Sequence, residues 1–229
     1  MAVIFWDFDG TVAYSTPLWS SSVLSALKEV EPETHIKLED IRKYMAFGFT
    51  WHTPGEDYSS LIGEKWWEFM NKHIYKSYIH LGVDRKKAQK ATGKVRNIIK
   101  EKRNYTLYDD FICTVTELKR RGFTNVILSN NYPELKEVMD KLQITEYFDG
   151  IIVSALEGYD KPRKELFEIA KNRYHAEAYY MIGDSVGADI IGGKNAGMTT
   201  ILVHNGYSKN ADYCCDKLID VLRILKIIH

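Results

Sequence analysis

Cysteine, long apolar runs and net charge are all scarce in this 229-residue sequence, and each shortage excludes a class of protein. Three cysteines, two of them adjacent, provide neither a disulfide framework nor the C-x-x-C pairs of a metal site. No stretch reaches the roughly 18 consecutive apolar residues that suggest a membrane-spanning helix. Lys and Arg total 31 and balance 31 Asp and Glu, which argues against a generally basic nucleic-acid-binding protein.

The remaining composition is that of a globular protein, with 45% hydrophobic and 27% charged residues. The chain begins with a strand pattern instead of a basic segment followed by an apolar one. We therefore expect a soluble, cytoplasmic protein, a monomer or homodimer without a membrane partner. The length favours one core that carries a large insertion.

The second half of the chain alternates between two kinds of segment, which predicts a parallel α/β sheet covered by helices on both faces. Short apolar runs typical of buried strands lie at 3–5, 126–128, 151–153, 179–182 and 200–203. Helical patterns lie at 110–121, 133–142, 164–172 and 186–196, and Asp216 is a candidate cap for a last helix. Ligands of such sheets bind at the carboxyl ends of the strands.

Residues 16–105 interrupt this alternation, because they contain helical patterns and no clear buried strand. Apolar residues recur at helical spacing in two stretches, 66–78 and 88–99, which predicts two helices that pack on each other. Residues 48–60, with Gly, Pro and small polar side chains, are typical of a loop. We predict a core domain of residues 1–15 and 106–229 and a helical domain of residues 16–105.

Two aspartates end the first predicted strand in the segment FWDFDGT. Residues two apart on a strand point to the same side, about 6.5 to 7 Å apart, so Asp7 and Asp9 can address one volume. Gly10 then permits a sharp exit of the chain. Such a pair is common in surface loops, so its meaning depends on its neighbours.

Polar residues also follow the later strands. Ser129 and the backbone amides of Asn130 and Asn131 precede a helix that we predict to open at Pro133, which suits an anion. Lys161 lies between a strand and a helix, where its ammonium could neutralise a phosphate or a carboxylate.

Asp184 and Asp189 flank the turn after another strand. Singly, these carboxylates and Ser129 could be helix caps. If the strands are parallel neighbours, however, four carboxylates converge at one edge and require a cation. Oxygen ligands without His or Cys suit Mg²⁺.

In chain order, the segments DFDGT, LSNN, DKP and GDSVGAD, the last continuing as IIGGKNAGM, resemble the four motifs of the haloacid dehalogenase superfamily. The resemblance is closest over residues 2–14 and 107–206, and it points to the branch whose helical cap follows the first motif. It implies a doubly wound, Rossmann-like core with the insertion as cap. Lys164 stands where the third motif often has a second proline.

The resemblance also implies an activity, the hydrolysis of a small phosphorylated metabolite. Asp7 would attack phosphorus and become an aspartyl phosphate, while Asp9 would protonate the leaving alcohol and later activate water. A metal-bound carboxylate is ionised and able to attack, whereas its neighbour can keep a proton under like-charge repulsion.

The same resemblance implies the ligand sets. Mg²⁺ would be held by Asp7, the backbone carbonyl of Asp9 and Asp184, with Asp189 as a weaker or indirect ligand. The phosphoryl oxygens would be received by Ser129, Lys161 and nearby amides such as that of Asn130.

Other chemistries remain to be weighed. Relatives that cleave carbon–halogen bonds or phosphonates usually lack an acid at the position of Asp9, and sugar phosphomutases of this branch typically carry a histidine where this chain has Trp19. A noncatalytic binding module is a third alternative, because residues 85–103 hold nine Lys or Arg and one acid, Glu101. The apolar stripe on that helix favours a solvated polar face instead. Trp19, Trp51 and Tyr14 could touch substrate.

Overall fold

Six parallel strands form the main sheet in the computed structural model, which describes residues 2–15 and 17–227. Their spatial order is β5 (Gly150–Val153), β4 (Thr124–Ser129), β1 (Ala2–Trp6), β6 (Ala178–Gly183), β7 (Thr199–Val203) and β8 (Tyr213–Cys215). Five of them confirm the predicted strands. The sequence analysis missed β8, a short edge strand whose Tyr213 is exposed.

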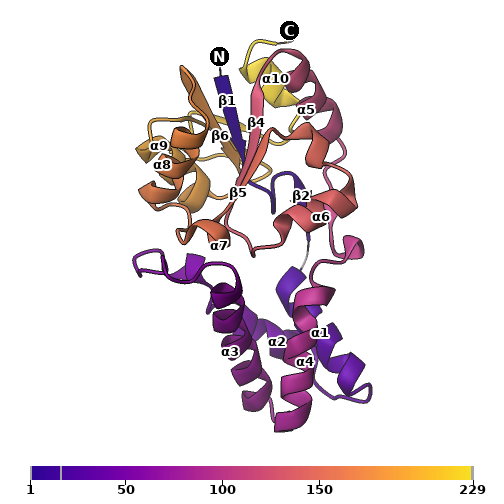
Figure 1. Cartoon of the computed structure of the whole chain (residues 1–229). Helices are drawn as coiled ribbons and strands as arrows, with labels where there is room; N and C mark the ends of the chain where they lie inside the picture. The colour runs from indigo at the N-terminus through magenta and orange to yellow at the C-terminus, as the bar shows by residue number, and fades with distance from the viewer. Residues whose placement is uncertain (1, 16, 228–229) are drawn as a thin grey trace.

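Both faces of the sheet are covered by helices, as predicted for a doubly wound fold (Figure 1). Ile4 and Trp6 of β1 belong to a core cluster with α5 (Phe111–Arg120), α6 (Leu135–Leu142) and α10 (Asp220–Ile224). Val3 and Phe5 belong to the opposite cluster, with α8 (Lys164–Arg173). Successive residues of a strand point to opposite faces, so the nearly continuous apolar sequence of β1 fits a strand buried on both sides.

Four helices of the insertion gather at the carboxyl ends of the strands, and we call them the helical group (Figure 1). They are α1 (Leu18–Val30), α2 (Leu38–Met45), α3 (Glu64–His80) and α4 (Arg85–Ile98). The apolar positions predicted for α3 and α4 are all buried. Ile74 and Tyr78 join a cluster within the helical group, whereas Trp66 and Met70 join the cluster that continues into the sheet.

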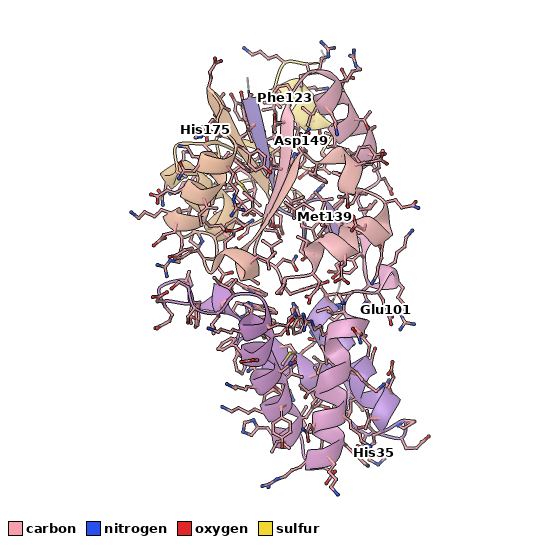
Figure 2. All side chains as sticks on the ribbon, viewed as in Figure 1. His35, Glu101, Phe123, Met139, Asp149 and His175 are labelled. Atoms are coloured by element: carbon pink, nitrogen blue, oxygen red, sulfur yellow. The ribbon has the colours of Figure 1, made fainter. Side chains whose placement is uncertain are left out.

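A two-stranded antiparallel ribbon lies where the chain leaves the sheet for the helical group and where it returns. It pairs β2 (Ala13–Tyr14) with β3 (Thr106–Leu107) and was not predicted. Glu101 lies between the end of α4 and the sheet, whereas His35 lies at the end of the helical group farthest from the sheet (Figure 2). The division into a core and a cap domain stays a prediction.

Two sets of contacts hold the helical group against the sheet edge. Glu134, just before α6, accepts hydrogen bonds from Trp67 Nε1 at 2.8 Å and from Arg96 Nε at 2.6 Å. On the other side, Arg163 donates to the Glu56 carbonyl at 2.8 Å. These contacts come from α3, α4 and the loop before α3, so they join the helical group at two places to the part of the chain that carries the sheet.

The ends of several elements differ from the predictions. Residues 186–196 form a π-helical turn (Val186–Ile191) followed by α9 (Gly192–Asn195) instead of one α-helix. Helix α6 begins at Leu135, two residues after Pro133. Asp216 does not cap α10, which begins at Asp220. The Ile219 amide at that end donates to Asp110 Oδ2 at 3.0 Å, an acceptor that is distant in the sequence.

The remaining short elements lie in connections. They are α7 (Ser154–Glu157) and single 3₁₀ turns at Thr50–His52, Lys102–Asn104 and Thr145–Tyr147. The first of these turns falls in the predicted loop 48–60 and carries Trp51. Among the described residues, no helix is long and apolar enough to cross a membrane.

Ion pairs account for much of the basic run at residues 85–103. Five of its nine basic side chains pair with acidic ones: Lys87, Lys94, Arg96, Lys100 and Arg103. The acidic partners come from α1, α3 and the region of α6 as well as from the run itself. This pairing favours a structural, solvated face over a surface for a polyanion.

Candidate active site

The chain turns sharply after β1 and carries two aspartates to the sheet edge. The Asp7 amide donates to the Ile182 carbonyl at 2.9 Å, so Asp7 continues the sheet one residue beyond β1. The Phe8 carbonyl then accepts amide hydrogen bonds from residues 11, 12 and 13, which curls the chain and places Asp9 on a turn. Both carboxylates line the same cavity, as predicted, although only Asp7 keeps the sheet register.

Gly10 is required in this turn for two reasons. Its φ of +83° lies in the left-handed region that favours glycine. A Cβ atom at this position would also overlap the carboxylate of Asp184. Because Gly10 has no side chain, the turn after β1 can lie directly against Asp184, the residue that follows β6.

Lys161 is the buried cation of the site, with only 1% of its surface exposed. Its ammonium donates to Asp7 Oδ1 at 2.8 Å and to Asp189 Oδ1 at 2.6 Å. A third hydrogen bond, of 2.7 Å, goes to the Leu128 carbonyl, so every ammonium hydrogen has an acceptor. Burial lowers the pKa of Lys161, but the charges of Asp189 and Asp7 outweigh burial and raise it.

Asp189 is completely buried and bonded at both oxygens. Oδ1 accepts from Lys161, and Oδ2 accepts from the Ser185 amide at 2.9 Å. Burial raises the pKa of Asp189, and the nearby charge of Lys161 opposes this shift. Its place at the first turn after β6 lets it hold both the lysine and the backbone of that turn.

Asp184 follows β6 directly and faces Asp7. Burial, and then the charges of Asp7 and Asp189, raise the pKa of Asp184 to about 7. One oxygen from each of these three carboxylates can lie within 4.8 Å of the others. The cluster, all oxygen donors with one ammonium against three acids, fits a hard divalent cation such as Mg²⁺.

Asp9 has a different environment, because neutral side chains donate to its oxygens. Its Oδ2 accepts from Asn131 Nδ2 at 2.8 Å, and its Oδ1 accepts from the Ser15 hydroxyl at 3.3 Å. Burial, and then the charge of Asp7, raise the pKa of Asp9 to about 7. A substantial fraction of Asp9 therefore carries a proton at neutral pH.

The predicted anion donors after β4 are engaged in different ways. Ser129 is 1% exposed, and its hydroxyl is buried without a hydrogen-bond partner among the described residues. The Asn130 side chain bonds twice to the backbone of Lys161: its Oδ1 accepts from the Lys161 amide at 2.7 Å, and its Nδ2 donates to the Lys161 carbonyl at 2.9 Å. The Asn131 amide donates to Ser154 Oγ at 3.2 Å, so it is not free for an anion.

A cavity of about 440 Å³ brings most of the candidate residues together. Six of the seven predicted site residues line it: Asp7, Asp9, Asn130, Lys161, Asp184 and Asp189. Ser129 is not in the lining, and neither is Tyr14, which is 44% exposed and packs on Tyr108. Trp19 and Trp51 do line the cavity, as the sequence analysis suggested.

The sequence analysis missed the side-chain amide of Asn131 and the hydroxyl of Ser15. Both bind Asp9 and so fix the carboxyl group that holds the proton. Asn131 was recognised only for its backbone amide, although its position at a strand tip was a usable signal for the side chain too. Ser15 lies at the predicted domain boundary, where no motif marks it.

Comparisons with known proteins agree with this geometry. A model of haloacid dehalogenase-like hydrolases matches residues 1–197. Pyrophosphatase PpaX of Bacillus mycoides is 27% identical over 236 residues, covering 99% of this chain and 97% of that protein. Glyceraldehyde 3-phosphate phosphatase of Pyrococcus furiosus is 30% identical over 124 residues, and the chain spans about half of that relative's length (52%).

Solved structures show the same fold. The HAD-hydrolase YfnB of Bacillus subtilis, whose crystal structure is bound to magnesium, superposes with a TM-score of 0.74 at 21% identity, over 98% of each chain. The family match spans most of the sequence, and the parallel sheet carries the four motifs at one edge. This chain belongs to the haloacid dehalogenase-like hydrolase family.

Proposed function

We propose that this protein is a Mg²⁺-dependent phosphatase that hydrolyses a small phosphomonoester through an aspartyl phosphate on Asp7. The observation that carries the proposal is the pair Asp7 and Asp9, two carboxyl groups in one cavity with opposite environments. Asp7 is beside an ammonium, whereas Asp9 is held by neutral donors and keeps a proton. Pairs of acids with divergent environments are typical of acid and nucleophile roles.

In the first half of the reaction, a carboxylate oxygen of Asp7 attacks phosphorus, and the bond from phosphorus to the ester oxygen breaks. Asp9 gives its proton to that leaving oxygen, so the alcohol departs neutral. In the second half, the Asp9 carboxylate takes a proton from water, which attacks phosphorus and restores Asp7. Asn131 and Ser15 keep Asp9 oriented through both steps.

Asp7, Asp184 and the backbone carbonyl of Asp9 would hold Mg²⁺. Bound Mg²⁺ supplies positive charge that neutralises phosphoryl oxygens. Asp189 serves this centre indirectly in our proposal, because Lys161 and the Ser185 amide already occupy its oxygens. YfnB, with the same fold, was crystallised with magnesium, which supports the choice of metal.

Phosphoryl oxygens would be received by the backbone at Asn130, by the Ser129 hydroxyl, which has no hydrogen-bond partner among the described residues, and by Lys161, whose ammonium would exchange one of its present acceptors for a phosphoryl oxygen. Lys161 also orients Asp7, because its ammonium donates to Asp7 Oδ1 at 2.8 Å. The Asn130 side chain contributes by fixing the backbone of Lys161.

Two alternatives receive less support. A sugar phosphomutase would need an acid or base near residue 19, where Trp19 packs against Phe49 and Tyr132. A noncatalytic module that binds an acidic partner through α4 is disfavoured, because so many of the basic side chains there are ion-paired. A cytoplasmic location, the two-domain division and a monomeric or dimeric state remain our predictions.

The named activities of the relatives leave the substrate open. One names glyceraldehyde 3-phosphate, which has an uncharged leaving group, and another names pyrophosphate, whose leaving group is an anion. Both names agree on the cleavage of a bond between phosphorus and oxygen. We propose that this chain acts on a small phosphorylated metabolite.

Phosphate release from p-nitrophenyl phosphate tests the proposal. Asp7→Asn should abolish it, EDTA should stop it, and added Mg²⁺ should restore it. Asp109→Asn, a matched change at an exposed aspartate, should leave the rate unchanged. A wild-type protein that releases no phosphate from a broad ester panel with Mg²⁺, or an Asp7→Asn variant with wild-type activity, would refute the proposal.

A further inference from the structure

Part of the cavity wall comes from the helical group and from the turn Thr50–His52, and this part is mainly apolar. It includes Pro17 and Leu18 at the start of α1, Trp19 in its first turn, Met45 at the end of α2, and Trp51. A phosphoryl group at the strand tips would therefore direct its leaving group toward these side chains. Ser20, also in the lining, adds a hydroxyl.

Positive charge is nearly absent from the described lining. Lys161 is its only cationic side chain, and all three of its ammonium hydrogens already have acceptors at the strand tips. The lining contains no arginine and no histidine among the residues that the structure describes. The helical group thus offers no cation to a second anionic group on the substrate.

Negative charge, in contrast, is concentrated there. Four carboxyl groups face one ammonium, and the bound metal would be needed for the phosphoryl group and its carboxylate ligands. A leaving group that carried a carboxylate or a second phosphate would enter a partly apolar space beside Asp9 without a partner. An unpaired charge in such a space is strongly disfavoured.

The aromatic part of the wall packs on further rings. The rings of Trp51 and Phe49 stack at 4.7 Å with an angle of 13°, and Trp19 lies 4.8 Å from Phe49. The ring centroids of Trp51 and Trp66 are 6.1 Å apart. Trp19 and Trp51 both line the cavity, so the leaving group meets aromatic surface, against which a ring-shaped or planar carbon skeleton packs well.

We infer that the substrate is a monophosphate ester of an uncharged alcohol with a ring-shaped or planar face, such as a sugar or an aromatic alcohol. Phosphorylated carboxylic acids, diphosphates and bisphosphates are excluded by the missing cation. This inference rests on the proposed function, because it concerns the leaving group of the same reaction. It selects among substrates that the carboxylate centre alone would treat alike.

Matched ester pairs test the charge of the leaving group. Glucose 1-phosphate and glucuronic acid 1-phosphate differ only in the carboxylate, as do phenyl phosphate and 4-carboxyphenyl phosphate. The wild-type protein with Mg²⁺ should show at least a tenfold higher kcat/KM for the neutral member of a pair. Equal values, or a preference for the acids, would overturn the inference.

A charge placed in the wall provides a gain-of-function test. Met45→Lys puts an ammonium in the lining and should lower the ratio of kcat/KM for the neutral ester to kcat/KM for the acidic ester at least fivefold. Met45→Gln, of similar length and uncharged, should leave this ratio unchanged.

A change at Trp51 tests the aromatic wall. Trp51→Leu should raise KM for phenyl phosphate at least fivefold with little change for ethyl phosphate. Trp51→Phe, which keeps an aromatic ring, should have a KM for phenyl phosphate close to that of the wild-type protein. Equal KM changes for both esters would contradict a role of Trp51 in holding the ring.

Binding separates this inference from the hydrolysis itself. In Asp7→Asn, which cannot form the aspartyl phosphate, tryptophan fluorescence reports binding of the same esters. Tenfold tighter binding of the neutral members would support the leaving-group inference. If the wild-type protein then released no phosphate from the same esters, the proposed hydrolysis would be refuted while the leaving-group inference stood. Binding of neither member, or equal binding of both, would overturn the inference.

Discussion

Replacing Lys161 by methionine is the perturbation whose cost the structure defines best. The change keeps an unbranched side chain, one heavy atom shorter, and removes the ammonium that Asp7, Asp189 and the Leu128 carbonyl share at 2.6–2.8 Å. Asp189 has no exposed side-chain surface, so water cannot replace the lost partner. Breaking a buried ion pair by removing one partner costs about 3–5 kcal/mol, and we expect Lys161→Met to lose this amount of unfolding free energy at pH 7.5.

The pH dependence of this loss of unfolding free energy follows from the carboxylates that are left without a cationic partner. Burial already raises the pKa of Asp189, and without the ammonium that opposes this shift Asp189 binds a proton still more tightly in the folded state than in the unfolded state. The destabilisation should therefore shrink as pH falls from 7.5 to 5.5. Urea unfolding followed by tryptophan fluorescence, with EDTA present, measures the free energy at both pH values.

Two control variants frame the result. Lys164→Met removes a lysine whose side chain is 75% exposed, and it should cost less than about 0.5 kcal/mol. Asp189→Asn added to Lys161→Met removes one stranded charge, so the double variant should lose less than the sum of the single changes. A Lys161→Met protein within about 1 kcal/mol of wild type at pH 7.5, or one that loses further stability on acidification, would refute the reasoning.

Three further predictions concern the site and its closure. Folded-state pKa values of about 7 for Asp9 and Asp184 lie above the ordinary 3.8, so metal-free protein should lose about 2 kcal/mol or more of unfolding free energy as pH rises from 5 to 8; a flat profile in urea titrations would contradict this. Gly10→Ala should weaken Mg²⁺ binding in calorimetry more than Gly122→Ala does. Gly122 has the same φ of +83° but open space around an added Cβ, so equal effects would show that backbone strain, and not the contact with Asp184, accounts for the weaker binding. Glu134→Ala removes the acceptor shared by α3 and α4, and amide hydrogen exchange in both helices should accelerate while β4 is unchanged; unaltered exchange would show that this contact does not hold the helical group in place.

Much of the core and of the site could be predicted because the strand pattern and the polar residues of the site lie next to each other in the sequence. A buried parallel strand such as β1 is apolar throughout, so the two aspartates at its end stand out in the sequence. Gly10 and Lys161 were identified in the same way, as residue types with a specific use at a strand tip. The parallel order of the strands then brought distant tips together.

Other features depend on contacts that no local pattern encodes. The strand β8 has three residues and an exposed Tyr213, and β2 and β3 have two residues each, too few for a periodic signal. The helix α10 begins beside Asp110 instead of at Asp216, because the acceptor for its first amides comes from elsewhere in the chain. Likewise, the two hydrogen bonds between the Asn130 side chain and the Lys161 backbone join residues that are 31 apart in the sequence.

The central claim is that Asp7 becomes phosphorylated, and chemical trapping of that group tests it most directly. Asp9→Asn slows attack by water, whereas p-nitrophenol departs without a proton, so this variant should accumulate the aspartyl phosphate with p-nitrophenyl phosphate and Mg²⁺. Borohydride reduces an acyl phosphate to an alcohol, and tandem mass spectrometry should then find homoserine at position 7 only when substrate is present. Turnover without homoserine at position 7, or with the modification at another carboxylate, would contradict the account.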